Sequence, residues 1–390
     1  MALANTARSY GSVARSLHWL TALLILTAFP LGLIANTWPW ETSDQLAVKA
    51  TLFSLHKTLG VAVFAVAVLR ILWAVAQPRP AALHPDRGWE TGAAAVVHSL
   101  LYLSLVAVPL SGWVHHAATT GFAPIWWPLG QGLPFVPVDD RLAAGAAAAH
   151  WLFTKLLAAA LVLHVAGALK HHVIDRDATQ RRMWRGTPAG AEGRRGHGWG
   201  PPGVAVAVYG LATAPALALV PAAAERPALA GGAGNWQVSE GRLAIAVRQM
   251  GARVEGGFDT WVADIAFDEE TRDGTVEVRI DTGSLRLGTV TAQALEPDFL
   301  DAADHPEAVF AADILGAPDG SYLAKGTLRL RGAEAPVRLP FTLRIDGDTA
   351  RMEGTATIDR RDFAIGTGQT DPATLGFEVK VTVTLTAHRG

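Results

Sequence analysis

The sequence predicts a two-part fold: an all-α transmembrane bundle of four helices plus a fifth membrane helix, followed by an all-β antiparallel barrel. Three observations carry this prediction. Apolar stretches long enough to cross a bilayer follow one another through the first half of the chain. From about Gly234 the pattern changes to the period-two alternation of strands. The charge balance also reverses, because residues 1–200 hold 16 Lys and Arg against 9 Asp and Glu, and residues 201–390 hold 17 against 26.

Composition excludes several chemistries. The 390 residues contain no cysteine, which removes disulfides, thiolate-bound iron–sulfur clusters and covalently attached c-type haem. The 13 histidines are therefore the candidate metal ligands. A basic half can indicate nucleic-acid binding, but here the basic residues stand at the ends of apolar spans. Membrane topology explains that arrangement, and no nucleic acid is expected as a partner.

The membrane spans follow from length and hydropathy. The five predicted spans are Leu17–Ile34, Leu52–Ala76, Gly92–His115, Ala146–Val173 and Pro201–Ala224. The fifth is rich in alanine and has an alternative interpretation, since small residues near its end, Ala218–Ala224, resemble a signal-type cleavage site. We favour its retention as an anchor.

Basic residues give the orientation. The N-terminus, the 77–91 hairpin and the 170–200 segment hold 2, 2 and 7 Lys and Arg, whereas the two opposite loops hold only Lys49 and Arg141. Positive residues mark the cytoplasmic side, so the N-terminus is expected in the cytoplasm. The fifth span would then deliver the C-terminal half to the periplasmic side.

The second half reads as short strands separated by turns. Asp319-Gly320 and Asp346-Gly347 are turn signals, and one helical interruption is expected near Thr289–Leu300. Many strands with one apolar face favour a sandwich or a closed barrel. The predicted strands are Leu243–Arg248, Thr275–Ile280, Tyr322–Leu330, Val337–Phe341 and Phe377–Leu385.

Four histidines form the candidate functional site. His150 and His164 lie on one face of the fourth span, roughly 21 Å apart along the helix, which is too far for one shared metal. In the deduced topology His18 shares the inner depth of His164, and His56 shares the outer depth of His150. Each pair could hold haem iron from both sides, an arrangement that suits electron transfer because no coordination position stays open. The alternative is that such histidines merely cap or link helices.

Other residues around these sites have two interpretations. His98 could replace His18 as a ligand, although a packing or substrate-site role is favoured. Arg70 and Arg15 at the inner site, and Lys57 and Lys155 at the outer one, could pair with haem propionates, or the lysines could extend to the headgroups. Small residues should let a ring approach closely, and these are Gly60, Gly167 and Ala158–Ala160. The interfacial histidines are expected to be solvated, and these are His115, His116, His171 and His172.

Residues 8–185 resemble the bacterial cytochrome b561 family, di-haem proteins with four membrane helices. The matching segments are Arg15-Ser-Leu-His18-Trp19, His56-Lys-Thr-Leu-Gly60, Arg70, and His150 with His164-Val-Ala-Gly-Ala-Leu-Lys-His171-His172. The resemblance implies two b haems with His18, His56, His150 and His164 as axial ligands and Arg70 beside a haem. It also implies a multi-pass protein of the bacterial inner membrane that exchanges electrons with ubiquinol-type quinones.

Residues 235–390 resemble the YceI-like family, lipocalin-like barrels that bind polyisoprenoid lipids, including isoprenoid quinones. The family usually has a histidine where this chain reads Gln249-Met250-Gly251. In Ile358-Asp-Arg360-Arg-Asp-Phe363, a solvated turn is favoured over acid–base chemistry for Asp359, Arg360 and Asp362. The other supporting segments are Gly256-Gly-Phe258, Asp298-Phe-Leu300, His305-Pro306 with Phe310, and Gly326-Thr-Leu-Arg-Leu-Arg-Gly332.

The predicted domains are therefore a di-haem membrane domain, a basic cytoplasmic linker, a fifth membrane helix and a lipid-binding barrel, at residues 8–185, 186–200, 201–224 and 234–390. The favoured function is quinone-linked electron transfer through two haems, with membrane lipid, the quinone pool and a polyisoprenoid ligand as partners. One alternative is an isoprenoid-lipid carrier or sensor anchored by the haem domain. Another is oxidation of a small periplasmic donor such as superoxide, with quinone as acceptor.

Overall fold

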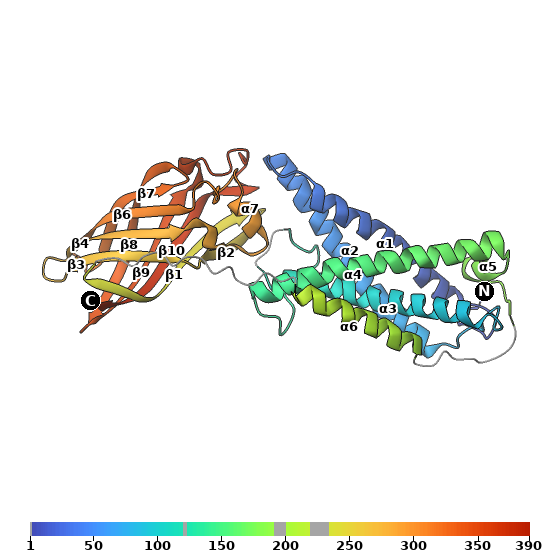
Figure 1. Cartoon of the computed structure of the whole chain (residues 1–390). Helices are drawn as coiled ribbons and strands as arrows, with labels where there is room; N and C mark the ends of the chain where they lie inside the picture. Colours follow the sequence, from blue (N-terminus) through green and yellow to red (C-terminus); the bar gives the residue numbers. More distant parts are fainter. Residues whose placement is uncertain (1, 120–122, 191–199, 219–233) are drawn as a thin grey trace. The chain divides into compact units, whose positions relative to one another are not determined.

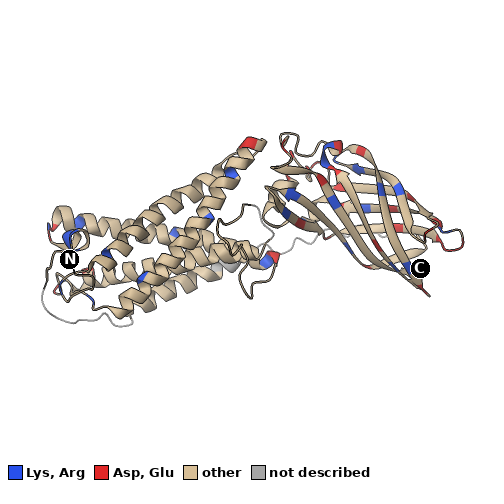
Figure 2. Cartoon of the chain, turned by 180° about the vertical axis from the view of Figure 1, so that it is seen from behind, with Lys and Arg blue, Asp and Glu red and all other residues tan. Residues whose placement is uncertain are grey.

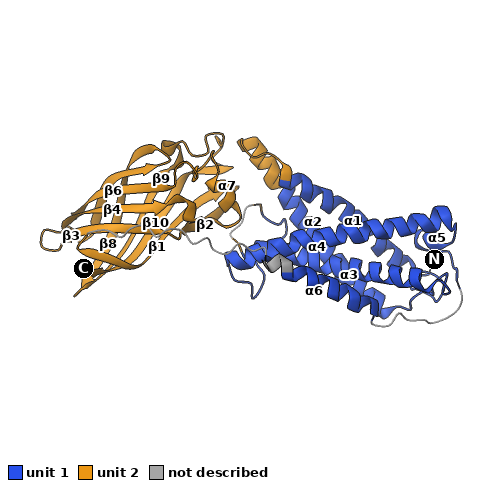
Figure 3. Ribbon diagram, in the orientation of Figure 1, with its two compact units in different colours: residues 1–36, 52–118, 124–223 blue, residues 37–51, 119–123, 224–390 orange. Residues whose placement is uncertain are grey.

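The computed structural model describes residues 2–119, 123–190, 200–218 and 234–390. The chain divides into two compact units, residues 1–36, 52–118 and 124–223 in one and residues 37–51, 119–123 and 224–390 in the other (Figure 3). Parts of the predicted linker, of the fifth span and of its cleavage-like segment, at 191–199 and 219–224, lie outside the described residues.

Long helices form the first half (Figure 1). Among the described residues, four helices are long and apolar enough to cross a membrane, which confirms the first four of the five predicted spans. Charged residues are sparse along the long helices and more frequent along the barrel strands (Figure 2). The four helices are α1 (Ser12–Thr37), α2 (Ser43–Ala76), α3 (Gly88–Ala117) and α4 (Asp140–Leu169), the last extended by a π-helical turn over Lys170–Ile174.

The helices extend beyond the apolar segments that predicted them. His56 and His150 were expected to open their spans, but α2 begins at Ser43 and α4 at Asp140. At α4 the Asp139 carboxylate accepts a hydrogen bond from the backbone N–H of Leu142 (2.7 Å) and so caps the helix N-terminus. Hydropathy locates the membrane-embedded part of a helix, whereas such polar caps locate its end.

The four helices share one apolar core. Ile25 of α1, Val63 of α2 and Leu105 of α3 pack together with Leu157 of α4. Leu157 stands seven residues from both His150 and His164, so this core lies between the two histidine levels. The packed aliphatic side chains exclude water from the middle of the bundle.

A shorter helix, α6 (Gly200–Ala218), covers one side of α3 and α4. Its Tyr209 is buried, its hydroxyl lies 2.5 Å from Ser104 Oγ, and its ring contacts Phe153 at 4.8 Å between centroids. α6 falls within the predicted fifth span but is not among the four candidate spans, so that span stays a prediction. A six-residue helix, α5 (Thr179–Trp184), follows the π-helical turn.

The second half is a closed antiparallel barrel of eight strands, which confirms the predicted barrel and removes the sandwich alternative. The ring runs β1-β10-β9-β8-β7-β6-β4-β3, and pairing of β1 with β10 and β3 closes it. The short strand β5 (Leu285–Arg286) pairs with β2 (Ala252–Phe258), which pairs with the second half of β1. The eight are β1 (Trp236–Gln249), β3 (Trp261–Asp268), β4 (Asp273–Asp281), β6 (Glu307–Gly316), β7 (Tyr322–Leu330), β8 (Ala333–Asp346), β9 (Thr349–Asp359) and β10 (Leu375–Arg389).

Local sequence explains two details of the barrel. The expected helical interruption is present as α7 (Thr291–Leu295), preceded by a 3₁₀ turn at Gly288–Val290. Gly256 of β2 lies so close to β5 that a Cβ atom there would stand 1.9 Å from the carbonyl oxygen of Arg286. Only glycine permits that approach, which accounts for one member of the Gly256-Gly257 pair.

Candidate functional site

The structure brings the four histidines together in the two predicted pairs. The ring centroids of His18 and His164 are 6.1 Å apart, and those of His56 and His150 are 6.3 Å apart. A metal–imidazole bond is about 2 Å long, so two imidazoles on opposite sides of one iron have centres roughly 6 Å apart. Both pairs therefore have the spacing that a bis-histidine haem site needs.

The outer pair also has the hydrogen bonding of metal ligands. His56 Nδ1 lies 2.9 Å from the carbonyl oxygen of Ala28, and His150 Nδ1 lies 2.9 Å from that of Val108. A carbonyl can only accept, so each Nδ1 carries the proton and each Nε2 keeps a lone pair that is free to bind a metal. These bonds also fix the orientation of both rings.

Two glycines make these hydrogen bonds possible, and sequence reasoning missed both. Gly32 and Gly112 each stand four residues after the carbonyl that accepts the histidine N–H, where a side chain would cover that carbonyl. A Cβ at Gly32 would lie 2.7 Å from the His56 ring, and one at Gly112 would lie 2.9 Å from the His150 ring. The glycines named from the sequence, Gly60 and Gly167, have open space beside them instead. The signal available in the sequence was a glycine inside an apolar span, Gly32 in the first and Gly112 in the third.

The inner pair, His18 and His164, has the ring spacing of a bis-histidine site, but the hydrogen bonding of His18 differs from that of the outer pair. Arg70 Nη2 lies 3.2 Å from His18 Nδ1, and a guanidinium only donates, so His18 Nδ1 accepts here. The Arg70 guanidinium also lies over the Tyr102 ring at 5.1 Å. His98 is close as well, with its ring 5.1 Å from that of His164. The alternative ligand weighed from the sequence thus lies beside the inner pair, together with the predicted Arg70.

The lysines assigned to the outer site have different environments. Lys57 is buried, with 7% of its surface exposed, and its Nζ donates to Gln131 Oε1 at 3.3 Å. Burial keeps the Lys57 amine inside the bundle near His56, which excludes the headgroup interpretation for this residue. Lys155 is exposed and lies over the Trp151 ring at 5.4 Å. Arg15 donates to the carbonyl oxygen of Trp184 (3.1 Å).

Two expectations about polar residues were wrong. Of the four interfacial histidines expected to be solvated, only His172 is exposed, whereas His115, His116 and His171 are partly buried. His171 is hydrogen-bonded to Asp177, because the π-helical turn that ends α4 directs it into a polar cluster with the 77–87 loop. Arg360 was expected in a solvated turn, yet only 3% of it is exposed. The turn itself is present over Arg360–Phe363, but it folds the arginine inward, where backbone carbonyls surround it.

Outside the spans, Asp177 carries a perturbed carboxyl group. Its burial opposes ionisation, but hydrogen bonds from Thr179, His84 and His171 outweigh that effect and lower its pKa to about 2. The pKa of Asp175 is also lowered, chiefly by its hydrogen bond to Lys170. Both carboxylates are therefore ionised at neutral pH.

The barrel encloses a cavity of about 290 Å³ lined almost wholly by apolar side chains. Among its few polar lining groups, Gln249 and Gln293 each have one buried amide atom without a hydrogen-bond partner in the part of the chain that the structure describes. Gln249 is 5% exposed, and its free atom is Oε1. Such a cavity fits an elongated apolar ligand with a hydrogen-bonding head group.

Comparisons with known proteins agree with the two halves. Residues 9–186 match the family model of prokaryotic cytochrome b561, and residues 236–387 match that of the YceI-like domain. The chain is 33% identical over 188 residues to cytochrome b561 homolog 2 of Escherichia coli (strain K12), covering 47% of this chain and 95% of that protein. It is 25% identical over 177 residues to the probable superoxide oxidase CybB of Yersinia pestis, covering 45% and 96%. The structure of Burkholderia cenocepacia BcnA is similar with 28% identity and a TM-score of 0.36, covering 37% of this chain and 95% of that one.

Proposed function

Because the first half of this chain belongs to the prokaryotic cytochrome b561 family and the second half matches a YceI-like domain, we propose a quinone-linked electron carrier with an attached lipid-binding barrel. The membrane half would hold two b haems, one between His18 and His164 and one between His56 and His150. The observation that carries the proposal is the pair of imidazole spacings, 6.1 and 6.3 Å, at two levels of one bundle.

Bound haem with both axial positions filled supplies one-electron transfer without an open position for dioxygen. The residues of the chain perform the remaining tasks. Backbone carbonyls of Ala28 and Val108 hold the outer imidazoles in the ligand tautomer. The apolar core around Leu157 keeps water from the region between the two pairs. Arg70 places positive charge beside the inner pair, and Lys57 places an amine beside the outer pair.

We further propose that the protein lies in the bacterial inner membrane with its N-terminus cytoplasmic and its barrel periplasmic. The unequal distribution of Lys and Arg among the loops supports this orientation. In that topology the His56 and His150 pair faces the periplasmic half of the bilayer.

Anaerobic titration of the purified holoprotein with ubiquinol tests the redox function. We expect the reduced b-type absorption bands to appear stoichiometrically, because a bis-histidine haem exchanges electrons without ligand replacement. Dithionite reduction of the same sample gives the full amplitude as control. Complete insensitivity to ubiquinol, with normal dithionite reduction, would contradict the assignment of quinone as electron partner.

Superoxide as electron donor is the second candidate. The relative from Yersinia pestis bears the name probable superoxide oxidase, and buried Lys57 places an amine beside the outer pair. When this amine is protonated, it favours the approach of a small anion. Reduction of the haems by a superoxide-generating system, abolished by superoxide dismutase, would distinguish this donor from quinol.

For the barrel, we propose that Gln249 Oε1 accepts a hydrogen bond from the hydroxyl of an isoprenoid ligand head group. Its amide oxygen is buried in an otherwise apolar cavity, where an unmet acceptor costs about 1–3 kcal/mol. Gln249→Leu should therefore weaken binding of an isoprenoid quinol roughly tenfold or more, while binding of squalene, which has no hydroxyl, stays unchanged.

The matched control is Gln237→Leu, which alters an exposed glutamine of the same strand β1. Binding is measured on the full chain by equilibrium binding of radiolabelled quinol or squalene. Equal loss of quinol and squalene binding would indicate a packing defect and contradict the hydrogen-bonding role. Binding of both ligands with no redox response of the haems would favour a lipid carrier or sensor.

A further inference from the structure

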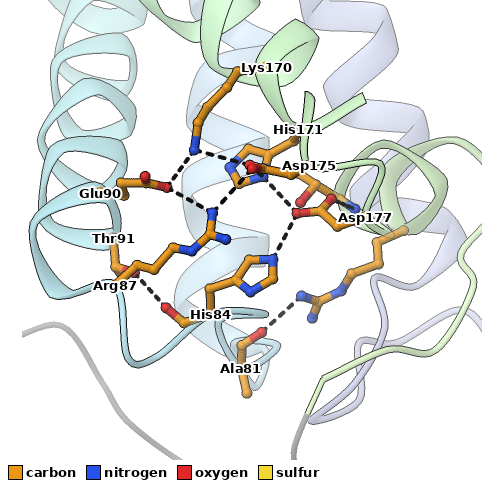
Figure 4. Close-up of polar contacts among 11 residues, drawn as sticks. Ala81, His84, Arg87, Glu90, Thr91, Lys170, His171, Asp175 and Asp177 are labelled. Atoms are coloured by element: carbon orange, nitrogen blue, oxygen red, sulfur yellow. Dashed lines mark hydrogen bonds and ion pairs between the residues drawn. The ribbon is translucent and has the colours of Figure 1, made fainter. Parts of the chain in front are cut away.

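A polar cluster joins the loop between α2 and α3 to the end of α4, and the haem assignment makes no use of it (Figure 4). His84 Nε2 lies 3.0 Å from Asp177 Oδ2, and His171 Nδ1 lies 2.7 Å from the same oxygen. The three ligand atoms all lie within 4.8 Å of one another. Donor atoms around a tetrahedral Zn²⁺ stand about 3–3.5 Å apart, so a small contraction would give a metal geometry.

Local structure holds these three residues in place. The chain leaves α4 through the π-helical turn, where the Asp175 N–H donates to the Lys170 carbonyl oxygen (3.1 Å). The Asp177 N–H donates to the His171 carbonyl oxygen (3.1 Å), and Asp177 Oδ1 accepts from the Thr179 N–H (2.8 Å). π-Helical turns are rare and are frequently found at functional sites.

The neighbouring cations Lys170 and Arg87 form ion pairs with Glu90 and Asp175 and not with Asp177. Lys170 Nζ lies 2.7 Å from Glu90 Oε2 and 3.0 Å from Asp175 Oδ2, and Arg87 Nη1 lies 3.2 Å from Asp175 Oδ1. These cations thus neutralise the carboxylates of Asp175 and Glu90. Asp177 Oδ2 contacts only the two imidazoles among the hydrogen bonds and ion pairs described for this region. One carboxylate and two imidazole nitrogens form a donor set that binds Zn²⁺ in preference to Mg²⁺ or Ca²⁺.

We propose that His84, His171 and Asp177 bind one divalent transition-metal ion of the Zn²⁺ type. Each imidazole binds the ion through the nitrogen that faces Asp177 and keeps its proton on the other ring nitrogen. Asp175 Oδ2, 3.1 Å from His171 Nδ1, is the nearest further oxygen ligand, and water can fill a remaining position. Metal binding ties the loop between α2 and α3 to the end of α4, seven residues beyond His164 of the inner pair.

Zinc binding to the untagged, haem-loaded full chain after chelator treatment tests this site. Equilibrium dialysis against ZnCl₂ with elemental analysis should give one Zn²⁺ per chain that Mg²⁺ does not displace. His84→Gln and His171→Gln should each weaken binding at least about thirtyfold, because each removes one of three ligands. Glutamine retains an N–H that can donate to Asp177, so the cluster stays hydrogen-bonded and the haem content serves as the check on folding.

His172→Gln is the matched control, since His172 is exposed beside His171 and lies outside the cluster. It should bind Zn²⁺ as tightly as the unaltered chain. Asp177→Asn gives a third variant that keeps the side-chain size and removes the charged ligand. Absence of stoichiometric zinc binding by the unaltered chain would overturn the proposal, and so would His84→Gln and His171→Gln variants that bind Zn²⁺ as tightly as the unaltered chain. Either result leaves the haem assignment untouched, because haem is quantified in the same samples.

Discussion

Replacing one histidine from each pair should strip the chain of all its haem, whereas replacing both histidines of one pair should leave one haem per chain. We expect His56→Ala/His164→Ala to be colourless and His56→Ala/His150→Ala to keep one b haem. The reason is that the proposed site holds a single iron between the His56 and His150 rings, whose centroids are 6.3 Å apart, so loss of the second histidine of a pair removes no further haem. Pyridine haemochrome quantitation against protein concentration measures the ratio.

Two further variants serve as controls for the predicted haem losses. His172→Ala changes an exposed histidine and should keep both haems. Gly112→Ala should disturb the same haem as His150→Ala, because its Cβ would displace the His150 ring from the Val108 carbonyl. If the same-pair and cross-pair double variants lose equal amounts of haem, the pairing is wrong. Retention of the inner haem in His18→Ala, together with its loss in His98→Ala, would assign the ligand role to His98.

The second large effect is expected at Arg360. Its buried guanidinium donates to five backbone carbonyl oxygens around the turn that precedes β10. Arg360→Met should destabilise the barrel by about 4 kcal/mol, because several buried carbonyls lose their only charged donor. For a domain of this size that corresponds to a fall in Tm of roughly 8–16 °C in the β-sheet circular dichroism signal. The acceptors are the carbonyls of Ile365 (2.7 Å), Gly366 (2.8 Å), Gly376 (3.0 Å), Leu375 (3.2 Å) and Gln369.

The neighbouring Arg361→Met is the matched control. Arg361 is exposed, pairs with Asp359 (2.6 Å) and lies over the Phe377 ring, so the barrel should melt close to its normal temperature. An unchanged melting temperature for Arg360→Met would mean that water satisfies the freed carbonyls and that the arginine has another role. The haem spectrum should be unaffected in both variants.

The sequence predicted the two-part fold because both halves have strong local signals. Apolar stretches longer than a bilayer core identify the four long helices, and period-two alternation identifies the strands. The match of Tyr322–Leu330 with β7 is exact, and the helical interruption lies where it was expected. Helix ends were predicted less well, since the capping of α4 by Asp139 depends on one polar side chain outside the apolar segment.

The sequence likewise predicted part of the candidate site and left another part open. Topology predicted which histidines share a depth, because rise per residue and the positive-inside distribution fix depth without knowledge of packing. It did not predict that Gly32 and Gly112 expose carbonyls to His56 and His150. Those contacts depend on the rotation of each helix about its axis, which the apolar periodicity of a membrane helix leaves open because both faces are hydrophobic.

The sequence alone thus determined the order of the domains, four membrane helices, the barrel and the two depths of imidazole pairs. Only the tertiary structure decided that Arg360 turns inward and that His171 lies beside His84 and Asp177. Hydropathy and periodicity are properties of neighbouring residues and can be read along the chain. Burial of a charged side chain, or a meeting of loops about ninety residues apart, depends on backbone turns and close packing that no local pattern records.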